Sequence, residues 1–196
     1  MVRRATTRTM PLLNSDAYQM RADASGEEKR LKGYAAVFGA IYELWPGATE
    51  SIDPHAFDEA LNDDVRCLID HETRLVLGRN KSGSCKLGID GHGLWFDNLI
   101  NDQDSDATNL YARVMRGDVS GCSFGFEILE EETEHRPDGS VHWTIKKVKL
   151  YEISICTFPA YEATSVEARR QDFETIRHRE VEDWKTKTKE RMSKWH

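Results

Sequence analysis

The chain lacks long apolar runs, a basic excess and an apolar leader, and each absence argues against a class of function. No segment of this 196-residue sequence approaches the roughly 20 apolar residues of a membrane-spanning helix. The net charge of -7 argues against the broad basic surface of a nucleic-acid-binding protein. Residues 1–8 are basic, but without an apolar stretch they do not form a secretory signal. We therefore expect neither a membrane nor a nucleic acid as a partner.

The sequence also lacks closely spaced cysteines. Its four cysteines show no Cys-x-x-Cys spacing, and three of them lie in apolar runs; they are Cys67, Cys85, Cys122 and Cys156. This pattern favours buried, reduced thiols of a cytosolic protein over disulfides or zinc ligands. We expect no cofactor and no metal ion.

Short strand-like segments separated by turn residues dominate the chain. They occupy residues 18–22, 32–38, 41–44, 65–71, 75–79, 82–89, 93–98, 120–129, 142–150 and 151–158. Many short strands with frequent turns are typical of an antiparallel sheet or barrel. We predict a mainly β protein of the α+β class, in which helices flank the sheet.

Two helices are predicted between these strands. The first begins at Asp53 as its N-cap, with Pro54 at the first helical position. The second covers residues 105–116 and ends at Gly117, a residue suited to the left-handed C-cap conformation.

The ends of the chain differ in composition from its middle. Residues 1–15 show little periodicity and are predicted to be disordered. Residues 16–170 hold the strands and form one predicted domain. Residues 171–196 are predicted to form a charged helical tail, because a thin apolar stripe recurs among charged residues. That tail is either a solvated helix or a docking segment for a larger assembly.

A glycine-rich stretch at residues 116–126 carries the main candidate for chemistry. Its sequence is RGDVSGCSFGF, in which Ser123 stands between Gly121 and Gly125. Glycines let the backbone bend and let another chain approach the hydroxyl, as a nucleophilic serine requires. The same pattern also fits a buried strand with a bulge. It does not fit the nucleophile elbow of α/β-hydrolases, because a turn-like segment follows and the best histidine lies upstream.

A nucleophilic serine needs a base and a group that orients the base. Among the seven histidines, His71 stands out because it ends an apolar strand between Asp70 and Glu72. Taken alone, such a histidine more often has a structural role, and its acidic neighbours would also suit a metal site. Glu152 is the one acid in an otherwise apolar strand, and a buried carboxylate needs a cation or histidine as partner. Alternatively, Glu152 faces solvent, because side chains alternate between the two faces of a strand.

In their order and spacing, several short motifs resemble the prohead serine proteases of tailed bacteriophages. The motifs occupy residues 33–39, 53–57, 65–71, 76–79, 82–83, 116–126, 151–161 and 163–168, and they span about residues 18–170. That family is itself similar to herpesvirus assemblin, a β-barrel protease surrounded by helices. The resemblance therefore implies an assemblin-like antiparallel β-barrel and the activity of a serine endopeptidase.

Assemblin uses a Ser-His-His triad, and the resemblance implies where a triad falls in this chain. The nucleophile stretch of assemblin is similar to Gly121-Cys-Ser-Phe-Gly125, which places the nucleophile at Ser123. His71 is the expected base. Glu152 stands where assemblin has its third residue, a histidine. Because a carboxylate is the commoner orienting group, a Ser-His-Glu triad is the expected form.

Two further residues enter this hypothesis. Ser120 is a rival nucleophile, because it also neighbours a glycine and the sequence alone leaves the register open. The oxyanion hole of assemblin lies on the loop after the third triad residue. Pro159 has no backbone N–H in the corresponding loop, so Ala160 is the expected donor.

The resemblance also implies partners and location. The expected substrates are the scaffold protein, the major capsid protein and the protease itself, cleaved inside the prohead in the host bacterial cytoplasm. A homodimer is possible by analogy with assemblin. Two alternatives stay open: a non-catalytic scaffold or capsid-assembly protein with the same fold, and a metal-dependent hydrolase that uses His71, Asp70 and another histidine.

Overall fold

The chain forms two compact units, Met1–Tyr161 and Glu162–His196. The computed structural model describes residues 6–9, 21–23, 28–157, 182 and 185–186. In the second unit the described residues are helical, and Lys185 Nζ lies 2.7 Å from Glu182 Oε1. The rest of the predicted helical tail, and the predicted boundary at residue 170, lie outside the described residues.

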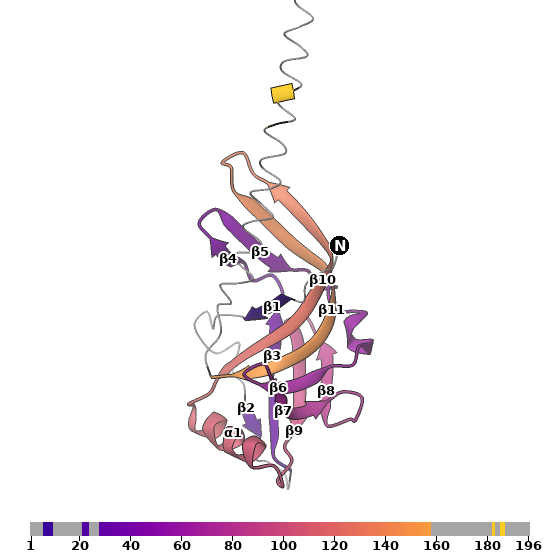
Figure 1. Ribbon diagram of the computed structural model, residues 1–196, viewed down its shortest axis with the longest axis vertical. Coiled ribbons are helices and arrows are strands. Elements are labelled where there is room, and N and C mark those ends of the chain that lie inside the picture. Colours follow the sequence, from indigo (N-terminus) through magenta and orange to yellow (C-terminus); the bar gives the residue numbers. More distant parts are fainter. Residues whose placement is uncertain (1–5, 10–20, 24–27, 158–181, 183–184, 187–196) are drawn as a thin grey trace, which may run out of the picture. The chain divides into compact units, whose positions relative to one another are not determined.

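The first unit contains two sheets, which Figure 1 shows with their labels. The larger sheet has seven strands: β1 (Thr6–Thr9), β4 (Tyr42–Trp45), β5 (Ala48–Ile52), β6 (Arg66–Ile69), β7 (Glu72–Arg79), β10 (Gly121–His135) and β11 (Val141–Cys156). The smaller sheet has four: β2 (Arg21–Asp23), β3 (Arg30–Val37), β8 (Cys85–Ile89) and β9 (Gly93–Leu99). The described part of this unit adds helix α1 (Ser105–Arg116) and the short 3-10 helix η1 (Ala60–Asn62). The prediction of a mainly β protein is confirmed.

The larger sheet is mixed, so the prediction of a wholly antiparallel sheet was wrong. β11 pairs antiparallel with β10, but it pairs parallel with β5 at residues 141–145 and with β6 at residues 152–155. Parallel partners must be joined by long crossover connections, and the segments between these strands are long. The described strands do not close into a barrel.

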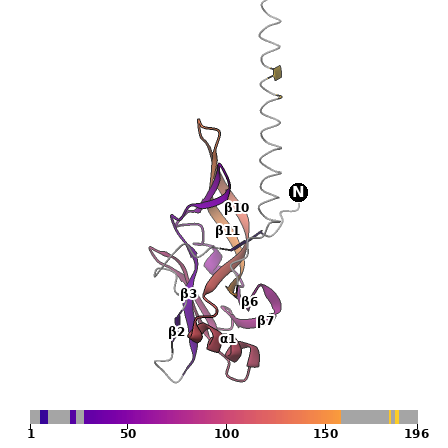
Figure 2. The same ribbon diagram turned by 90° about the vertical axis from the view of Figure 1, so that its left-hand side faces the viewer.

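The β10–β11 hairpin is the longest feature of this sheet and extends beyond the neighbouring strands (Figure 2). At its far end β5 pairs with β11, and β4 pairs with β5. At its near end Phe124 and Phe126 are completely buried, and the ring of Phe124 meets that of Phe57 at 5.6 Å. Because Ile153 and Ile155 also lie in this core, these odd positions near the end of β11 face the core, and the intervening Glu152 and Ser154 face away.

Helix α1 confirms the predicted helix at residues 105–116. The carboxylate of Asp104 accepts hydrogen bonds from the backbone N–H groups of Asp106 and Ala107, at 2.9 and 3.3 Å. Gly117 ends the helix with a φ of 86°, the left-handed conformation expected of a C-cap glycine. Within the described residues, α1 and the other helical segments are too short or too polar to cross a membrane.

The helix predicted to begin at Asp53 is absent, and turns leading into η1 replace it. The carboxylate of Asp53 does accept the His55 N–H at 2.9 Å, as an N-cap would. However, the Ala56 carbonyl accepts a hydrogen bond from Val148 N on β11, at 3.1 Å. This carbonyl is therefore bonded to the sheet, and the segment follows β11 instead of continuing as an α-helix. Lys146 of the same strand donates to Asp53 and lowers the pKa of its carboxyl group.

Gly93 offers a test of how tightly the smaller sheet is packed. A Cβ at this position would lie 2.0 Å from the backbone oxygen of Ala36. We expect Gly93→Ala to lower the free energy of unfolding by about 2–3 kcal/mol, since a backbone atom of the paired strand must move. The matched control is Gly91→Ala, whose Cβ would meet nothing within 4 Å. Urea denaturation of both variants checks this, and equal losses would contradict it.

Candidate active site

Ser123 lies within β10, between two paired strands. Its register partner in β11 is Ser154, and its partner in β1 is Thr9. Directly opposed residues in antiparallel strands project to the same face, so Ser123 and Ser154 share the face that points away from the apolar core. Ser123 has no exposed surface, whereas a nucleophilic serine was expected to be accessible. The register of β10 with β11 shifts between Gly125 and Phe126, because Tyr151 of β11 has no partner in this ladder.

His71 lies in the turn between β6 and β7, in an unusual backbone conformation. Asp70 and His71 have φ angles of 47° and 61°, a left-handed pair without glycine. Contacts with the end of β11 hold this turn. Asp70 N donates to the Ile155 carbonyl at 3.0 Å, and the Asp70 carboxylate accepts from Thr157 N at 2.7 Å and from Thr157 Oγ1 at 3.0 Å. Asp70 is thus turned toward Thr157.

The imidazole of His71 meets Glu152, as the sequence analysis expected of a triad. Nδ1 lies 2.8 Å from Glu152 Oε1, and the two side chains are 22% and 14% exposed. Alternation along β11 does place Glu152 on the face away from the core, but its carboxylate contacts His71 there. Gly125 lies opposite Glu152 in β10, and a Cβ on Gly125 would come within 2.5 Å of Glu152 Oε1. The space for this carboxylate therefore depends on Gly125.

Two residues of this site were missed in the sequence. The hydroxyl of Ser154 donates to Glu152 Oε2 at 2.5 Å and accepts a hydrogen bond from the backbone N–H of His71 at 3.2 Å. Cys156 Sγ lies 3.7 Å from His71 Nε2. The period-two spacing of residues 152, 154 and 156 was the available signal, since it puts all three side chains on one face.

The thiols near Ser123 are protonated at neutral pH. Burial raises the pKa of the Cys122 thiol to about 12, and burial is also the main reason that the pKa of Cys156 is raised. A neutral thiol is a poor nucleophile compared with a thiolate. All four cysteines are free in the structure, as expected.

Of the two remaining predicted residues, the structure describes Ser120. Ser120 is exposed and precedes β10, beyond Gly121, whose register partner is Cys156. Ala160 lies outside the described residues. Among the residues that are described, no cluster of three histidine, cysteine or acidic side chains has the geometry to hold a metal ion.

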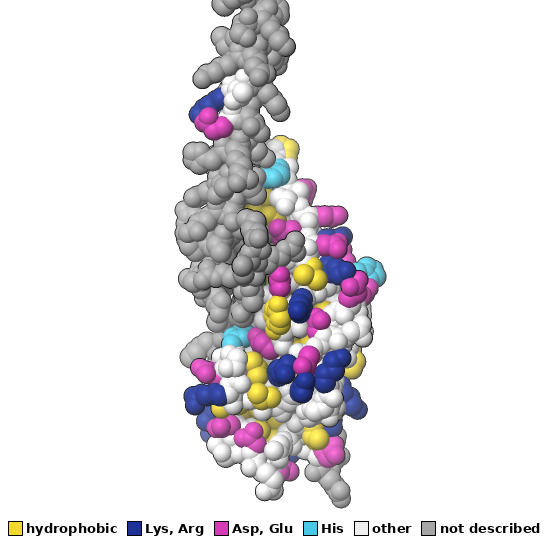
Figure 3. Space-filling view, turned by 45° about the vertical axis from the view of Figure 1, so that its right-hand side comes forward, with side chains coloured by type: hydrophobic (Ala, Val, Ile, Leu, Met, Phe, Trp, Pro, Cys, Tyr) yellow, Lys and Arg dark blue, Asp and Glu magenta, His cyan; other side chains and the backbone are white. Residues whose placement is uncertain are grey.

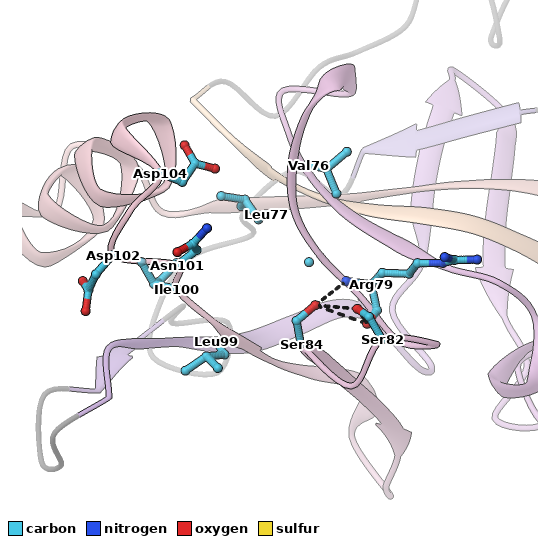
Figure 4. Close-up of a pocket in the computed structure, with 11 residues that line it drawn as sticks. Val76, Leu77, Arg79, Ser82, Ser84, Leu99, Ile100, Asn101, Asp102 and Asp104 are labelled. Carbon is cyan, nitrogen blue, oxygen red and sulfur yellow. Dashed lines mark hydrogen bonds between the residues drawn. The ribbon is translucent and has the colours of Figure 1, made fainter.

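A cavity of about 500 Å³ lies elsewhere, between β7, the end of β9 and the start of α1 (Figure 4). Ser84 Oγ accepts the Arg79 N–H there at 2.9 Å and lies 2.9 Å from Ser82 Oγ. Its lining includes none of the predicted site residues. On the molecular face in Figure 3, basic and acidic side chains are interspersed, so this face has no extended region of one charge.

Comparison with known protein families identifies the family of this chain. The family model described as caudovirus prohead serine protease matches residues 16–179. The chain belongs to this family. The prediction of a prohead protease of tailed phages is thereby confirmed, and with it the function of a capsid-maturation protease.

A sequence relative agrees with this assignment. The chain is 30% identical over 178 residues to the prohead protease of Enterobacteria phage HK97, an alignment that covers 88% of this chain and 74% of the relative. The solved structure of the bacteriophage T4 capsid assembly protease is another match, with a TM-score of 0.48 and 9% identity. That match covers 79% of this chain and 98% of the T4 chain.

Proposed function

We propose that this prohead protease is a serine endopeptidase of the Ser-His-Glu type. Ser123 is the nucleophile, His71 is the general base and Glu152 orients the base. The observation that carries the proposal is the 2.8 Å contact between His71 Nδ1 and Glu152 Oε1. A second observation supports it: Ser123 lies opposite Ser154 in the β10–β11 pair, and Ser154 is hydrogen-bonded to both His71 and Glu152.

The chemistry follows from the tautomer that this contact favours. With Nδ1–H donated to Glu152, the lone pair of His71 lies on Nε2 and can accept the hydroxyl proton of Ser123. Ser123 Oγ then attacks the peptide carbonyl, and the imidazolium returns its proton to the leaving amine. Water hydrolyses the acyl-enzyme by the same route. Backbone N–H groups would stabilise the oxyanion, and Ala160 stays the predicted donor.

The burial of Ser123 bears on when this chemistry can occur. A substrate carbonyl cannot reach a hydroxyl that has no exposed surface, so the surroundings of β10 must open first. β1 runs along the edge of β10 beside Ser123. A closed site suits a protease that is packaged together with its substrate and must stay inactive until assembly.

The proposed substrates are the scaffold protein, the major capsid protein and the protease itself. Cleavage would take place inside the prohead, in the host cytoplasm. The prohead protease of phage HK97 supports this by its name and its similarity. An assemblin-like barrel and a homodimer stay predictions that depend on the same family resemblance.

A fluorophosphonate probe tests the proposal, because it reacts with activated serines and needs no known cleavage site. We expect the probe to label Ser123 in protein co-assembled with the capsid protein of the same phage, and His71→Ala to abolish the labelling. Fragmentation of the tryptic peptide 117–146 distinguishes Ser123 from Ser120, since both lie within it and trypsin does not cleave before Pro137. Absence of labelling and of capsid cleavage in that assembly would favour a non-catalytic assembly protein, which the burial of Ser123 also suits.

A further inference from the structure

Ser154 has a hydroxyl that links two members of the proposed triad. Its side chain is 1% exposed, and it belongs to β11 between Glu152 and Cys156. A serine hydroxyl has one proton to donate and lone pairs to accept with. Here the hydroxyl donates a hydrogen bond to Glu152 Oε2 at 2.5 Å, and it accepts one from the backbone N–H of His71 at 3.2 Å.

We propose that Ser154 is a positioning residue, which holds Glu152 and His71 in the orientation that serves Ser123. The inference rests on the proposed Ser-His-Glu function. Ser154 does not itself exchange a proton with substrate in this scheme. It acts through the two residues that it bonds.

The first effect is on the plane of the Glu152 carboxylate. The terminal torsion of a glutamate side chain has a broad energy minimum, so one hydrogen bond leaves the carboxylate free to turn. Ser154 bonds Oε2 while His71 bonds Oε1, and two bonds to different oxygens define the plane. The carboxylate therefore presents Oε1 to the ring in a single orientation, as a pre-organised orienting group requires.

The second effect is on the backbone of His71. A left-handed conformation costs a residue other than glycine roughly 1 kcal/mol or more, so other contacts must maintain it. Asp70 is held by Ile155 and Thr157, and His71 by the bond from its N–H to Ser154 Oγ. Removing this hydroxyl takes away a contact that keeps the ring beside Glu152.

The charges around the imidazole make this effect measurable. Glu152 contacts the ring at Nδ1, and Cys156 contacts it at Nε2. The Cys156 thiol is neutral, because burial raises its pKa. The neighbouring Asp70 directs its carboxylate to Thr157. The orientation of the Glu152 charge therefore affects how readily His71 is protonated.

The first measurement is an NMR titration of the His71 imidazole in a Ser123→Ala background, where no catalysis is needed. We expect Ser154→Ala to lower the midpoint of this titration by about half to one pH unit, because a turned carboxylate stabilises the imidazolium less. Ser154→Thr keeps a hydroxyl and should restore the midpoint. If Ser154→Ala does not fold, Ser154→Cys replaces it, since a thiol fills the space but donates only weakly.

The second measurement is the rate of fluorophosphonate labelling against pH, with Ser123 present. We expect Ser154→Ala to slow labelling by about 10- to 100-fold, as loss of an outer partner commonly does, and to shift the pH profile. The matched control is Ser51→Ala, which removes another hydroxyl that contacts a histidine, 2.9 Å from His142 Nε2 on the same sheet. It should leave both the rate and the profile unchanged.

The two measurements separate failure of this inference from failure of the proposed function. An unchanged His71 midpoint in Ser154→Ala, or a shifted midpoint with an unchanged labelling rate, overturns the positioning role. If the unaltered protein is not labelled at Ser123, the proposed function fails, while the titration still decides whether Ser154 orients the pair.

Discussion

Replacing Ser123 with alanine is expected to stop cleavage of the capsid protein, with a loss of at least about 10⁴-fold in rate. In the proposed mechanism the hydroxyl oxygen of Ser123 forms the acyl-enzyme, and the adjacent Cys122 thiol cannot replace it because burial keeps this thiol neutral. Ser123→Ala should fold normally, since the change removes one oxygen from a position that alanine can occupy in a strand.

Intact-mass spectrometry of the protease, co-expressed with the capsid protein of the same phage, measures this outcome. The matched control is Ser120→Ala, three residues earlier and exposed, which should be processed like the unaltered protein. If only Ser120→Ala remains uncleaved, the nucleophile is Ser120 and the register derived from β10 is wrong. If both variants are trimmed, neither serine is the nucleophile.

Replacing Glu152 with glutamine is expected to lower the cleavage rate by about 10²- to 10⁴-fold without unfolding the protein. Glutamine keeps the shape of the side chain but loses the charge that stabilises the imidazolium. It can also present an N–H₂ group to Nδ1, which favours the tautomer whose Nε2 is protonated and cannot accept the proton of Ser123. The effect should appear in the chemical step and not in substrate binding.

The matched control for this variant is Glu127→Gln. Glu127 belongs to the same strand pair, two residues from Gly125, and accepts the Tyr151 hydroxyl at 2.9 Å on the exposed surface. Its replacement should leave the cleavage rate within about twofold, since exposed polar contacts contribute little. Equal losses for Glu127→Gln and Glu152→Gln would mean that the carboxylate of Glu152 has no special role.

Some features of the structure could be predicted from the sequence because they depend on residues that are neighbours in the chain. Helix α1 was predicted with its correct limits, since Asp104 and Gly117 cap the two ends of one continuous segment. Residues that stand out locally also pointed to the site: Ser123 between glycines, His71 at a strand end and Glu152 in an apolar strand. The contact between His71 and Glu152 agrees with that interpretation.

Other features depend on partners far away in the chain, and local patterns carry no information about them. The segment after Asp53 follows β11 because the Ala56 carbonyl bonds to Val148, some 90 residues later. Thr6–Thr9 lie in a segment predicted to be disordered, yet they pair with β10. The parallel pairing of β11 with β5 and β6 likewise arises from the path of the whole chain.

By itself, the sequence determined that this protein is mainly β, that it carries the motifs of a prohead serine protease, and which three side chains are the candidates for its chemistry. Only the tertiary structure decided that Ser154 joins two of these side chains and that Ser123 is buried between paired strands. The physical reason is that a hydrogen bond needs two groups about 3 Å apart. That proximity comes from strand register and from the left-handed turn at His71, which contacts with the end of β11 maintain.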